Sequence, residues 1–268
     1  MSTGRNLGQR LRMLFSSSYL LYLYLPILIL PLFSFNDSYY ISFPLKAFTL
    51  RWYAELAADP SILAALANSV QIAVVTALLS TALGVLSARA LTRGRLRGFK
   101  SIVGLIMLPL VIPELILAVS LLVVLNEASL GLGKWAVILG HMLICYPFAV
   151  AILMSRFEGF ATVLEEASLD LGATPWQTFW RVVFPLALPG IVASFLLTFT
   201  ISFDEFLIAF FLSSSEPTLP VYLWGQLRFP KKLPSALALG TLIIVVSFIV
   251  VAFAEWFRRR HAAAGDTP

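Results

Sequence analysis

Six long apolar runs, separated by short polar stretches, dominate the chain. They cover residues 19–35, 65–91, 102–125, 135–154, 186–212 and 236–256. A helix needs about 20 apolar residues to cross the hydrocarbon core of a bilayer, and five of the runs reach that length. The pattern therefore predicts an all-α membrane protein with six transmembrane helices.

The first run, over residues 19–35, is the shortest and contains Pro26 and Pro31. Basic residues precede it, so the run could be a cleaved signal peptide. The residues that follow, from Ser34 to Asp37, do not form a small-x-small cleavage site. We therefore expect an uncleaved first helix.

Composition supports the membrane interpretation. Of 268 residues, 59% are hydrophobic and 12% are charged, and the mean hydropathy is +0.90. Soluble domains average about 45–50% apolar and about 25% charged residues. The single cysteine, Cys145, excludes an internal disulfide framework or a cysteine metal site, and we expect no metal site. The net charge of +5 does not indicate nucleic acid, because the basic residues cluster at the ends of apolar runs.

The placement of Lys and Arg predicts the orientation in the membrane. If both termini are cytoplasmic, 13 of the 19 basic residues lie inside and 6 lie outside. The inside set is Arg5, Arg10, Arg12, Arg89, Arg93, Arg95, Arg97, Lys100, Arg156, Arg181, Arg258, Arg259 and Arg260, and the outside set is Lys46, Arg51, Lys134, Arg228, Lys231 and Lys232. We expect a cytoplasmic segment over 1–18, a membrane domain over 19–257 and a cytoplasmic tail over 258–268. We expect Arg93, Arg95, Arg97 and Lys100 to set this topology and to touch anionic lipid.

The long inside segment, residues 156–185, carries the most information. Residues 163–171 have helical character, with Glu165 and Glu166 near the start, where the helix dipole favours acids. Gly172 is a plausible stop signal at the end of this helix.

A second short helix is predicted directly afterwards. Thr174 is a suitable N-cap, and Pro175 suits the first helical position. The two helices should meet at an angle at Gly172 and Ala173, and their apolar faces need a cover. They either lie on lipid as an interfacial hairpin or insert into another protein as a docking knob. The apolar residues are Leu164, Leu169, Leu171, Trp176, Phe179 and Trp180.

The same segment resembles the EAA motif of bacterial ABC importer permeases. That motif is Glu-Ala-Ala, three residues, Gly, nine residues, then Ile-x-Leu-Pro. Glu166-Ala167-Ser168, Gly172 and the stretch 182–185 match its spacing throughout. The resemblance implies a type I ABC importer permease (MetI-like) fold, in which this loop forms a coupling helix seated in a groove of an ATPase subunit. The residues implied to couple are Glu165, Glu166, Ala167, Ser168, Asp170, Gly172 and Pro185.

Further stretches resemble the same permeases. Residues 48–53 are similar to their front half, and residues 202–206, 218–222 and 227–230 resemble the spermidine/putrescine subgroup. The resemblance implies import of a small cationic solute by alternating access in the bacterial inner membrane, not catalysis. The solute could be a polyamine such as putrescine or spermidine, another amine or an amino-acid-like compound. It also implies a homologous permease partner, two ATPase subunits and a solute-binding protein. The chain lacks a Gly-x-x-x-x-Gly-Lys-Ser/Thr loop, so we expect no cofactor here and ATP with Mg²⁺ on the partner.

Three acids lie inside the predicted spans, where ionisable residues are costly and usually functional. They are Glu114, Asp204 and Glu205. A helix that begins near Pro185 places Asp204 roughly 28 Å along its axis, toward the outer side. Neighbouring residues on a helix point about 100° apart, so at most one of Asp204 and Glu205 should face a central pathway.

These acids suit a cationic solute by charge complementarity. Aromatic side chains could add cation–π contacts, namely Phe203, Phe206, Tyr222 and Trp224. In the alternative interpretation, Glu114 satisfies backbone groups freed by Pro109 and Pro113, and Asp204 or Glu205 lies among lipid headgroups.

Two other function classes compete with the importer. A secondary transporter working alone would need repeated halves, and no convincing repeat is seen. An intramembrane enzyme would need a nucleophile and a base, or metal ligands, that face each other within the membrane. His141 and Cys145, four residues apart, are weak evidence for such a site. We expect His141 to be a hydrogen-bonded packing residue and Cys145 a small core residue. Asn68 and Gln71 should join helices through polar contacts.

Overall fold

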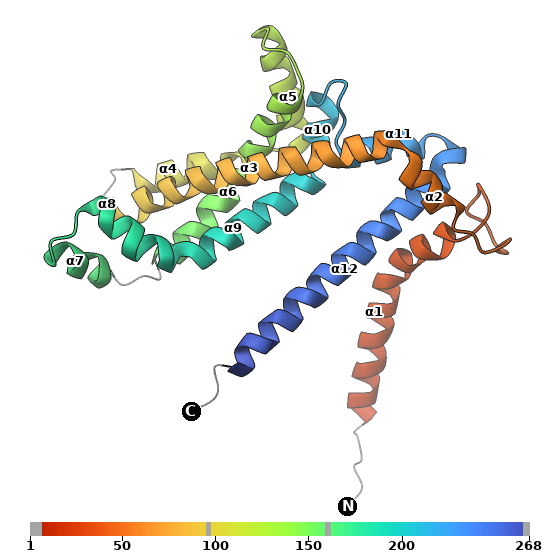
Figure 1. Ribbon diagram of the computed structural model, residues 1–268, viewed down its shortest axis with the longest axis horizontal. Coiled ribbons are helices and arrows are strands. Elements are labelled where there is room, and N and C mark those ends of the chain that lie inside the picture. The colour runs from red at the N-terminus through yellow and green to blue at the C-terminus, as the bar shows by residue number, and fades with distance from the viewer. Residues whose placement is uncertain (1–6, 95–97, 159–161, 265–268) are drawn as a thin grey trace, which may run out of the picture. The chain divides into compact units, whose positions relative to one another are not determined.

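The computed structural model describes residues 7–94, 98–158 and 162–264, and within these ranges the regular structure is helical apart from one isolated bridge between Asn36 and Phe48. Figure 1 shows the order of the elements. The chain divides into two compact units, one made of Met1–Pro60 and Leu223–Pro268 and the other of Ser61–Tyr222. Predictions that rest on Arg5, Arg95 and Arg97, or on the side chains of the tail, lie outside the described part.

The first unit contains two long helices and a short one. It comprises α1 (Leu7–Ser34), α2 (Arg51–Ala58), the 3₁₀ turn η3 (Pro230–Lys232) and α12 (Leu233–Ala264). Helix α12 packs against α1 and α2. The loop before α2 is held by Trp52, whose buried indole donates from Nε1 to the carbonyl of Asn36 at 2.9 Å. The guanidinium of Arg51 lies 4.1 Å from the centre of the same ring.

The second unit holds the remaining elements, except that the last of them passes into the first unit at Leu223. They are α3 (Pro60–Arg93), α4 (Phe99–Met107), the 3₁₀ turn η1 (Leu108–Leu110), α5 (Glu114–Glu127), α6 (Lys134–Glu158), α7 (Thr162–Asp170), α8 (Pro175–Thr178), the π-helical turn η2 (Phe179–Val183), α9 (Phe184–Asp204), α10 (Leu207–Leu212) and α11 (Leu219–Leu227). Its central contact is between α6 and α9. Small and polar side chains meet there, as is common where membrane helices pack closely.

The predicted packing residues lie at such contacts. His141 Nδ1 and Ser202 Oγ are 2.7 Å apart, and Cys145 Sγ lies 3.5 Å from the carbonyl oxygen of Thr198. Asn68 donates to the carbonyl of Pro217, and Gln71 accepts from Lys134. The predictions for His141, Cys145 and Gln71 are confirmed, whereas Asn68 joins α3 to the loop before α11 rather than to another helix.

The number of spans is confirmed only in part. Among the described residues, four helices are long and apolar enough to cross a membrane, and α4 with α5 adds a fifth if that bent pair is one span. The sixth predicted run falls within α12, several of whose side chains lie outside the described set.

Two predicted runs are broken rather than continuous. The third bends by 94° between Leu110 and Glu114, because Pro113 cannot continue the preceding helical hydrogen bonds. The fifth ends as a helix at Asp204, and Glu205 takes an extended conformation before α10 begins. Both breaks matter for the acids discussed below.

Gly140 is expected to be essential for packing between α6 and α10. A Cβ atom at this position would lie 2.5 Å from Cγ2 of the fully buried Ile208. Overpacking a tight core costs about 1–3 kcal/mol, so Gly140→Ala should lower the melting temperature of the purified protein. Gly104→Ala is the matched control, because its Cβ would meet nothing within 4 Å in helix α4. Equal melting temperatures for the two variants would contradict this packing.

Candidate functional site

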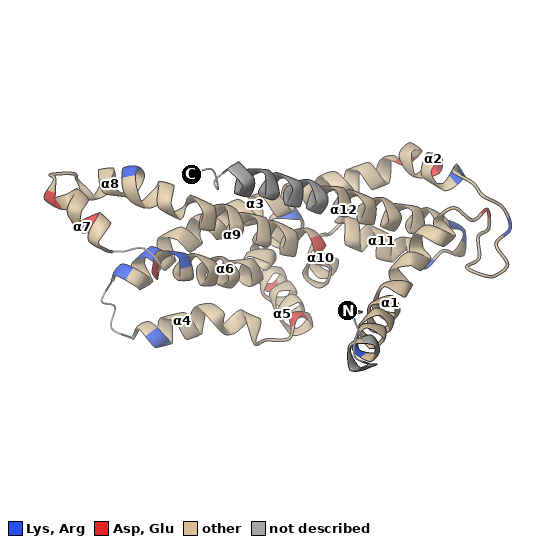
Figure 2. Cartoon of the chain, turned by 90° about the horizontal axis from the view of Figure 1, so that it is seen from below, with Lys and Arg blue, Asp and Glu red and all other residues tan. Residues whose placement is uncertain are grey.

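Helices α7 and α8 form an elbow, defined here as residues 162–178. Figure 2 shows the elbow projecting beyond the ends of α4 and α6, with acids on α7. Gly172 has a φ of +86°, and Ala173 N–H donates to the carbonyl of Ser168 at 3.1 Å, which closes the end of α7. The predicted first helix, the turn at Gly172 and Ala173 and the start of a second helix at Pro175 are confirmed. The second helix is not short as predicted, because it continues through η2 into α9.

The start of α8 is fixed by a reciprocal cap. Thr174 Oγ1 accepts from the backbone N–H of Gln177, while Gln177 Oε1 accepts from the N–H of Thr174. This capping box satisfies two backbone donors, with Pro175 at the first helical position. Ser168 and Thr178 hydroxyls, 3.0 Å apart, tie α7 to the end of α8. Local hydrogen bonds therefore hold the elbow in one shape.

The elbow exposes large apolar side chains beside acids. Leu171 is 89% exposed and Trp176 is 70% exposed. Glu166, Ala167 and Asp170 are also exposed. Apolar surface of this kind marks an interaction site when it is contiguous. Pro185, the last residue of the motif, is exposed near the start of α9, directly after the π-helical turn η2.

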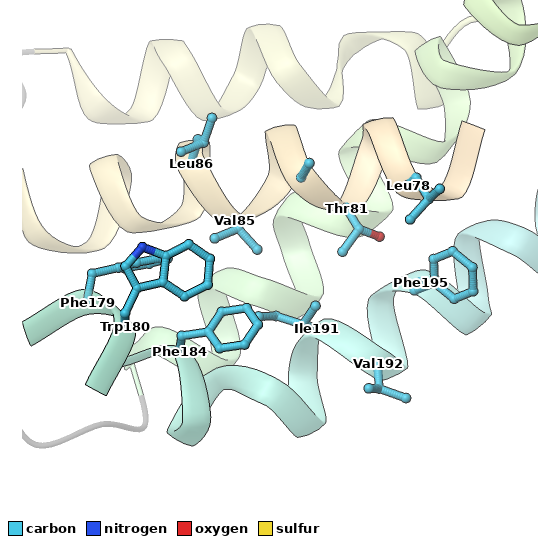
Figure 3. A pocket seen from close by; sticks show the side chains of 11 residues that line it. Leu78, Thr81, Val85, Leu86, Phe179, Trp180, Phe184, Ile191, Val192 and Phe195 are labelled. Atoms are coloured by element: carbon cyan, nitrogen blue, oxygen red, sulfur yellow. The ribbon is translucent and has the colours of Figure 1, made fainter. Parts of the chain in front are cut away.

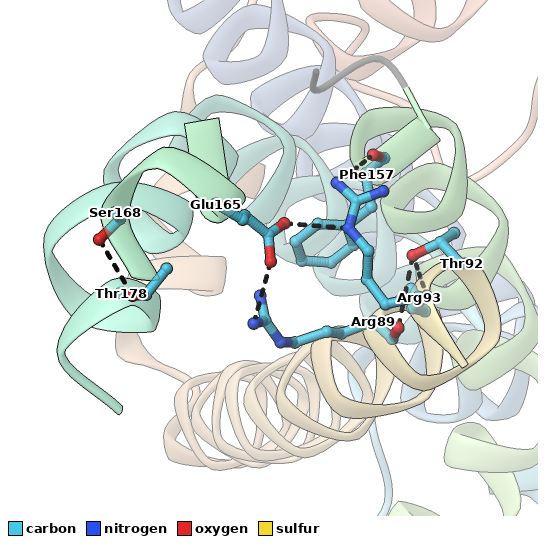
Figure 4. Close-up of polar contacts among 8 residues, drawn as sticks. Arg89, Thr92, Arg93, Phe157, Glu165, Ser168 and Thr178 are labelled. Atoms are coloured by element: carbon cyan, nitrogen blue, oxygen red, sulfur yellow. Dashed lines mark hydrogen bonds and ion pairs between the residues drawn. The ribbon is translucent and has the colours of Figure 1, made fainter. Parts of the chain in front are cut away.

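Glu165 differs from its neighbour Glu166 because it points back to the membrane helices. Its carboxylate accepts from Arg93 Nε at 2.9 Å and from Arg89 Nη2 at 3.2 Å, and only 15% of the side chain is exposed (Figure 4). Arg93 also donates from Nη2 to the carbonyl of Phe157. We name Arg89, Arg93 and Glu165 the ion-pair clamp.

The clamp corrects the sequence prediction for Arg93. That residue was expected to touch anionic lipid, but it binds a carboxylate of its own chain because α7 folds back beside the end of α3. The available signal was a pair of arginines four residues apart on one helix face, which repel each other unless an anion lies between them.

The three acids within the apolar runs lie near the two helix breaks. Glu114 is the first residue of α5, Asp204 is the last of α9, and Glu205 occupies the break before α10. Helix α10 packs against α5, and Glu205 lies within electrostatic range of both other acids. The two helix breaks thus bring together acids that are about 90 residues apart in the sequence.

Glu205 and Asp204 are used differently. Glu205 Oε1 accepts from the backbone N–H of Ile208 at 3.0 Å, so it caps the start of α10. Asp204 and Glu114 are exposed in this chain. A helix break therefore separates Asp204 from Glu205, where a continuous helix with a rotation of about 100° was expected, and the pathway role of either acid stays a prediction.

The aromatic residues predicted to accompany these acids are divided between the two units of the chain. The ring of Phe203 stacks on Phe199, with centroids 5.9 Å apart, and the ring of Phe206 lies beside that of Phe210 at 5.5 Å. Tyr222 ends the second unit, whereas Trp224 belongs to the first. The structure therefore places Phe203, Phe206 and Tyr222 in the same unit as the acids.

An apolar cavity of about 610 Å³ lies between α3 and the segment from η2 to α9 (Figure 3). Its walls include Phe179, Trp180 and Phe184 on one side and Val85 and Leu86 on the other. No charged residue lines it. This cavity suits hydrocarbon rather than a charged solute.

Apolar helices, an exposed apolar elbow and acids at broken spans are together typical of a membrane transport subunit. Residues 80–262 match the family model described as the binding-protein-dependent transport system inner membrane component. The chain belongs to this family, the transmembrane permease subunits of ABC importers, whose role is transport rather than catalysis.

Curated relatives match over nearly the whole chain. The spermidine/putrescine transport system permease protein PotC of Haemophilus influenzae is 36% identical over 242 residues, which cover 90% of this chain and 93% of the relative. PotC of Escherichia coli K12 is 33% identical over 94% of this chain and 96% of its own length. The putrescine transport system permease protein PotI of the same organism is 34% identical, covering 90% of this chain and 88% of PotI.

Solved structures share the fold. A bacterial ABC transporter involved in the import of the acidic polysaccharide alginate aligns with a TM-score of 0.71 at 18% identity, covering 94% of this chain and 99% of that chain. The alginate transporter in complex with a periplasmic protein bound to an alginate pentasaccharide gives 0.73 at 19% identity, covering 95% and 94%. The permease fold implied by the sequence is confirmed.

Proposed function

We propose that the chain is a permease subunit for a polyamine such as putrescine or spermidine in a bacterial inner membrane. The carrying observation is the identity of 33–36% to spermidine/putrescine permeases over at least 90% of the chain. The exposed carboxylates of Asp204 and Glu114 support it, because a polyamine is a chain of cations. Glu205, Phe203, Phe206, Tyr222 and Trp224 complete the proposed pathway set.

The proposed assembly has the parts of a binding-protein-dependent importer. A homologous permease pairs with this chain, two ATPase subunits bind ATP with Mg²⁺, and a solute-binding protein delivers the polyamine. The chain crosses the membrane six times with both termini in the cytoplasm, as the distribution of basic residues favours. The elbow then lies on the cytoplasmic side, where the ATPase subunits are.

In this proposal the elbow is the docking surface for one ATPase subunit. Exposed Leu171 and Trp176 supply apolar contact area, and exposed Glu166 and Asp170 supply charge at its rim. Ala167 is small enough for close approach, while Gly172 and Pro185 fix the path of the chain. When ATP closes the ATPase pair, the elbows move and the spans open outward, and hydrolysis resets them.

Uptake of radiolabelled putrescine by the complete complex in proteoliposomes tests the substrate. We expect ATP-dependent uptake that excess unlabelled putrescine or spermidine suppresses, while uncharged diols of the same length do not compete. Competition by amino acids but not by diamines would assign a different amine-bearing solute. Uptake by this subunit alone, driven by an ion gradient, would contradict the importer assignment altogether.

A further inference from the structure

We propose that the ion-pair clamp of Arg89, Arg93 and Glu165 transmits movement of the elbow to α3, and that Glu165 is a positioning residue for transport rather than a docking residue. This inference rests on the proposed docking of the elbow to an ATPase subunit. It assigns the two adjacent glutamates to opposite tasks. Glu166 faces the partner, and Glu165 faces the membrane helices of its own chain.

Besides the chain segment that leads from α6 into α7, two connections among the described residues join the elbow to the membrane helices. The first is covalent, because α8 continues through η2 into α9 as one apolar helix of 30 residues, Pro175–Asp204. That connection moves α9 but does not itself pull on α3. The second connection runs from α7 to α3 through Glu165 and the two arginines (Figure 4).

The clamp is better placed than an ordinary surface ion pair. The three side chains are 15–27% exposed, so solvent screens them less than fully exposed charges. Arg93 is held from a second side by the carbonyl of Phe157 at the end of α6. Arg89 also lies 5.2 Å from the ring centre of Phe179 in η2. The end of α3 is therefore tied to α7 and to η2, the turn that directly follows the elbow.

Removal of the carboxylate should release α7 from α3. Arg89 and Arg93 are one helical turn apart, so without Glu165 they would be two half-buried like charges that repel each other. The elbow itself would persist, because the Thr174 cap, the turn at Gly172 and the Ser168–Thr178 contact do not involve the clamp. The elbow should still dock to the ATPase subunit, but its movement should no longer be transmitted to α3.

The experiment compares uptake with ATP hydrolysis in the complete complex reconstituted with ATPase subunits, sister permease and binding protein. Glu165→Gln should copurify with its partners and hydrolyse ATP within about twofold of the parent, yet transport about tenfold less solute per ATP, in the range of coupling between distant sites. Glu158→Gln makes the same acid-to-amide change at an exposed residue at the end of α6 and should leave the ratio unchanged.

Charge reversal gives a second readout that a purely structural role would not produce. Glu165→Arg should uncouple at least as strongly as Glu165→Gln, and combining it with Arg93→Glu should restore at least half of the parent ratio. An unchanged ratio in Glu165→Gln, or no recovery in the assembled double variant, would overturn the inference. Loss of copurification in Glu165→Gln would overturn it too, since Glu165 would then shape the docking surface.

The proposed docking function fails in a different way. It fails if the parent complex assembles without contact between the elbow and an ATPase subunit, or if Glu166→Gln leaves association unchanged. Measurement of the parent and of Glu166→Gln therefore separates the two hypotheses before Glu165 is tested.

Discussion

The variant Gly172→Val should lower solute uptake by the assembled importer by more than about tenfold. It should also weaken binding of the ATPase subunit. Gly172 has a φ of +86°, where a side chain with a Cβ costs about 1–2 kcal/mol and a β-branched one more. Relief of that strain would change the backbone turn between α7 and α8. The exposed apolar side chains of the two helices would then no longer form one surface. Copurification of ATPase subunits and solute uptake measure the two effects.

Two variants make this expectation specific to the elbow. Gly131→Val introduces a similar strain, at a φ of +73° in the loop between α5 and α6, and should leave association with the ATPase unchanged. Gly172→Asn should retain most of the function, because asparagine tolerates the left-handed conformation. Full activity of Gly172→Val would show that the turn is not needed for docking.

The second large effect is expected at the far end of α9. Asp204→Asn keeps the size of the side chain but removes its charge, and it should lower uptake of a polyamine by about tenfold or more, given the strength of a partly desolvated charge contact. ATP hydrolysis and complex assembly should persist, because Asp204 belongs to the acids near the α9–α10 break and not to the elbow. Radiolabelled uptake at several substrate concentrations measures the loss.

Glu127→Gln is the matched control for Asp204→Asn. It makes the same chemical change at an exposed acid, the last residue of α5, without altering the break between α9 and α10. Uptake by this control should equal that of the parent. Undiminished uptake by Asp204→Asn would remove Asp204 from the pathway and leave Glu114 as the exposed carboxylate of the proposal.

The elbow could be predicted from sequence almost to the residue, because its signals are local. The expected helix over 163–171 is α7, which spans Thr162–Asp170, and Thr174 and Pro175 begin α8 as predicted. A cap, a proline at the first position and a glycine stop act within one turn of helix. These local signals predict where a helix begins and ends without knowledge of the tertiary structure.

The breaks in the spans could be predicted less well. The bend before Glu114 has Pro109 and Pro113 as a warning, but the break at Glu205 and Phe206 has neither glycine nor proline beside it. It is stabilised by tertiary structure, because α10 buries Ile208, Ala209 and Leu212 against α5 and α6. An apolar run cannot reveal a break whose cause lies elsewhere in the fold.

The clamp and the meeting of the three acids were missed for the same reason. Glu165 follows Arg93 by 72 residues, and Glu205 follows Glu114 by a longer distance still. Spacing within one helix predicts which residues share a face, but not which remote helix will lie opposite. The sequence shows that these residues are charged and lie in or near apolar runs. Only the structure shows which residues they contact.

The continuous helix from Pro175 to Asp204 determines how far a movement of the elbow could be transmitted along this subunit. Thirty residues at about 1.5 Å each give a path of roughly 45 Å, with the elbow at one end and an exposed carboxylate at the other. A lever of that length needs to tilt by only about 5° to displace its far tip by about 4 Å, which is comparable to the width of a hydrocarbon chain. In the proposed importer, a small movement of the elbow by an ATPase subunit would therefore reach Asp204 at the opposite end of this helix.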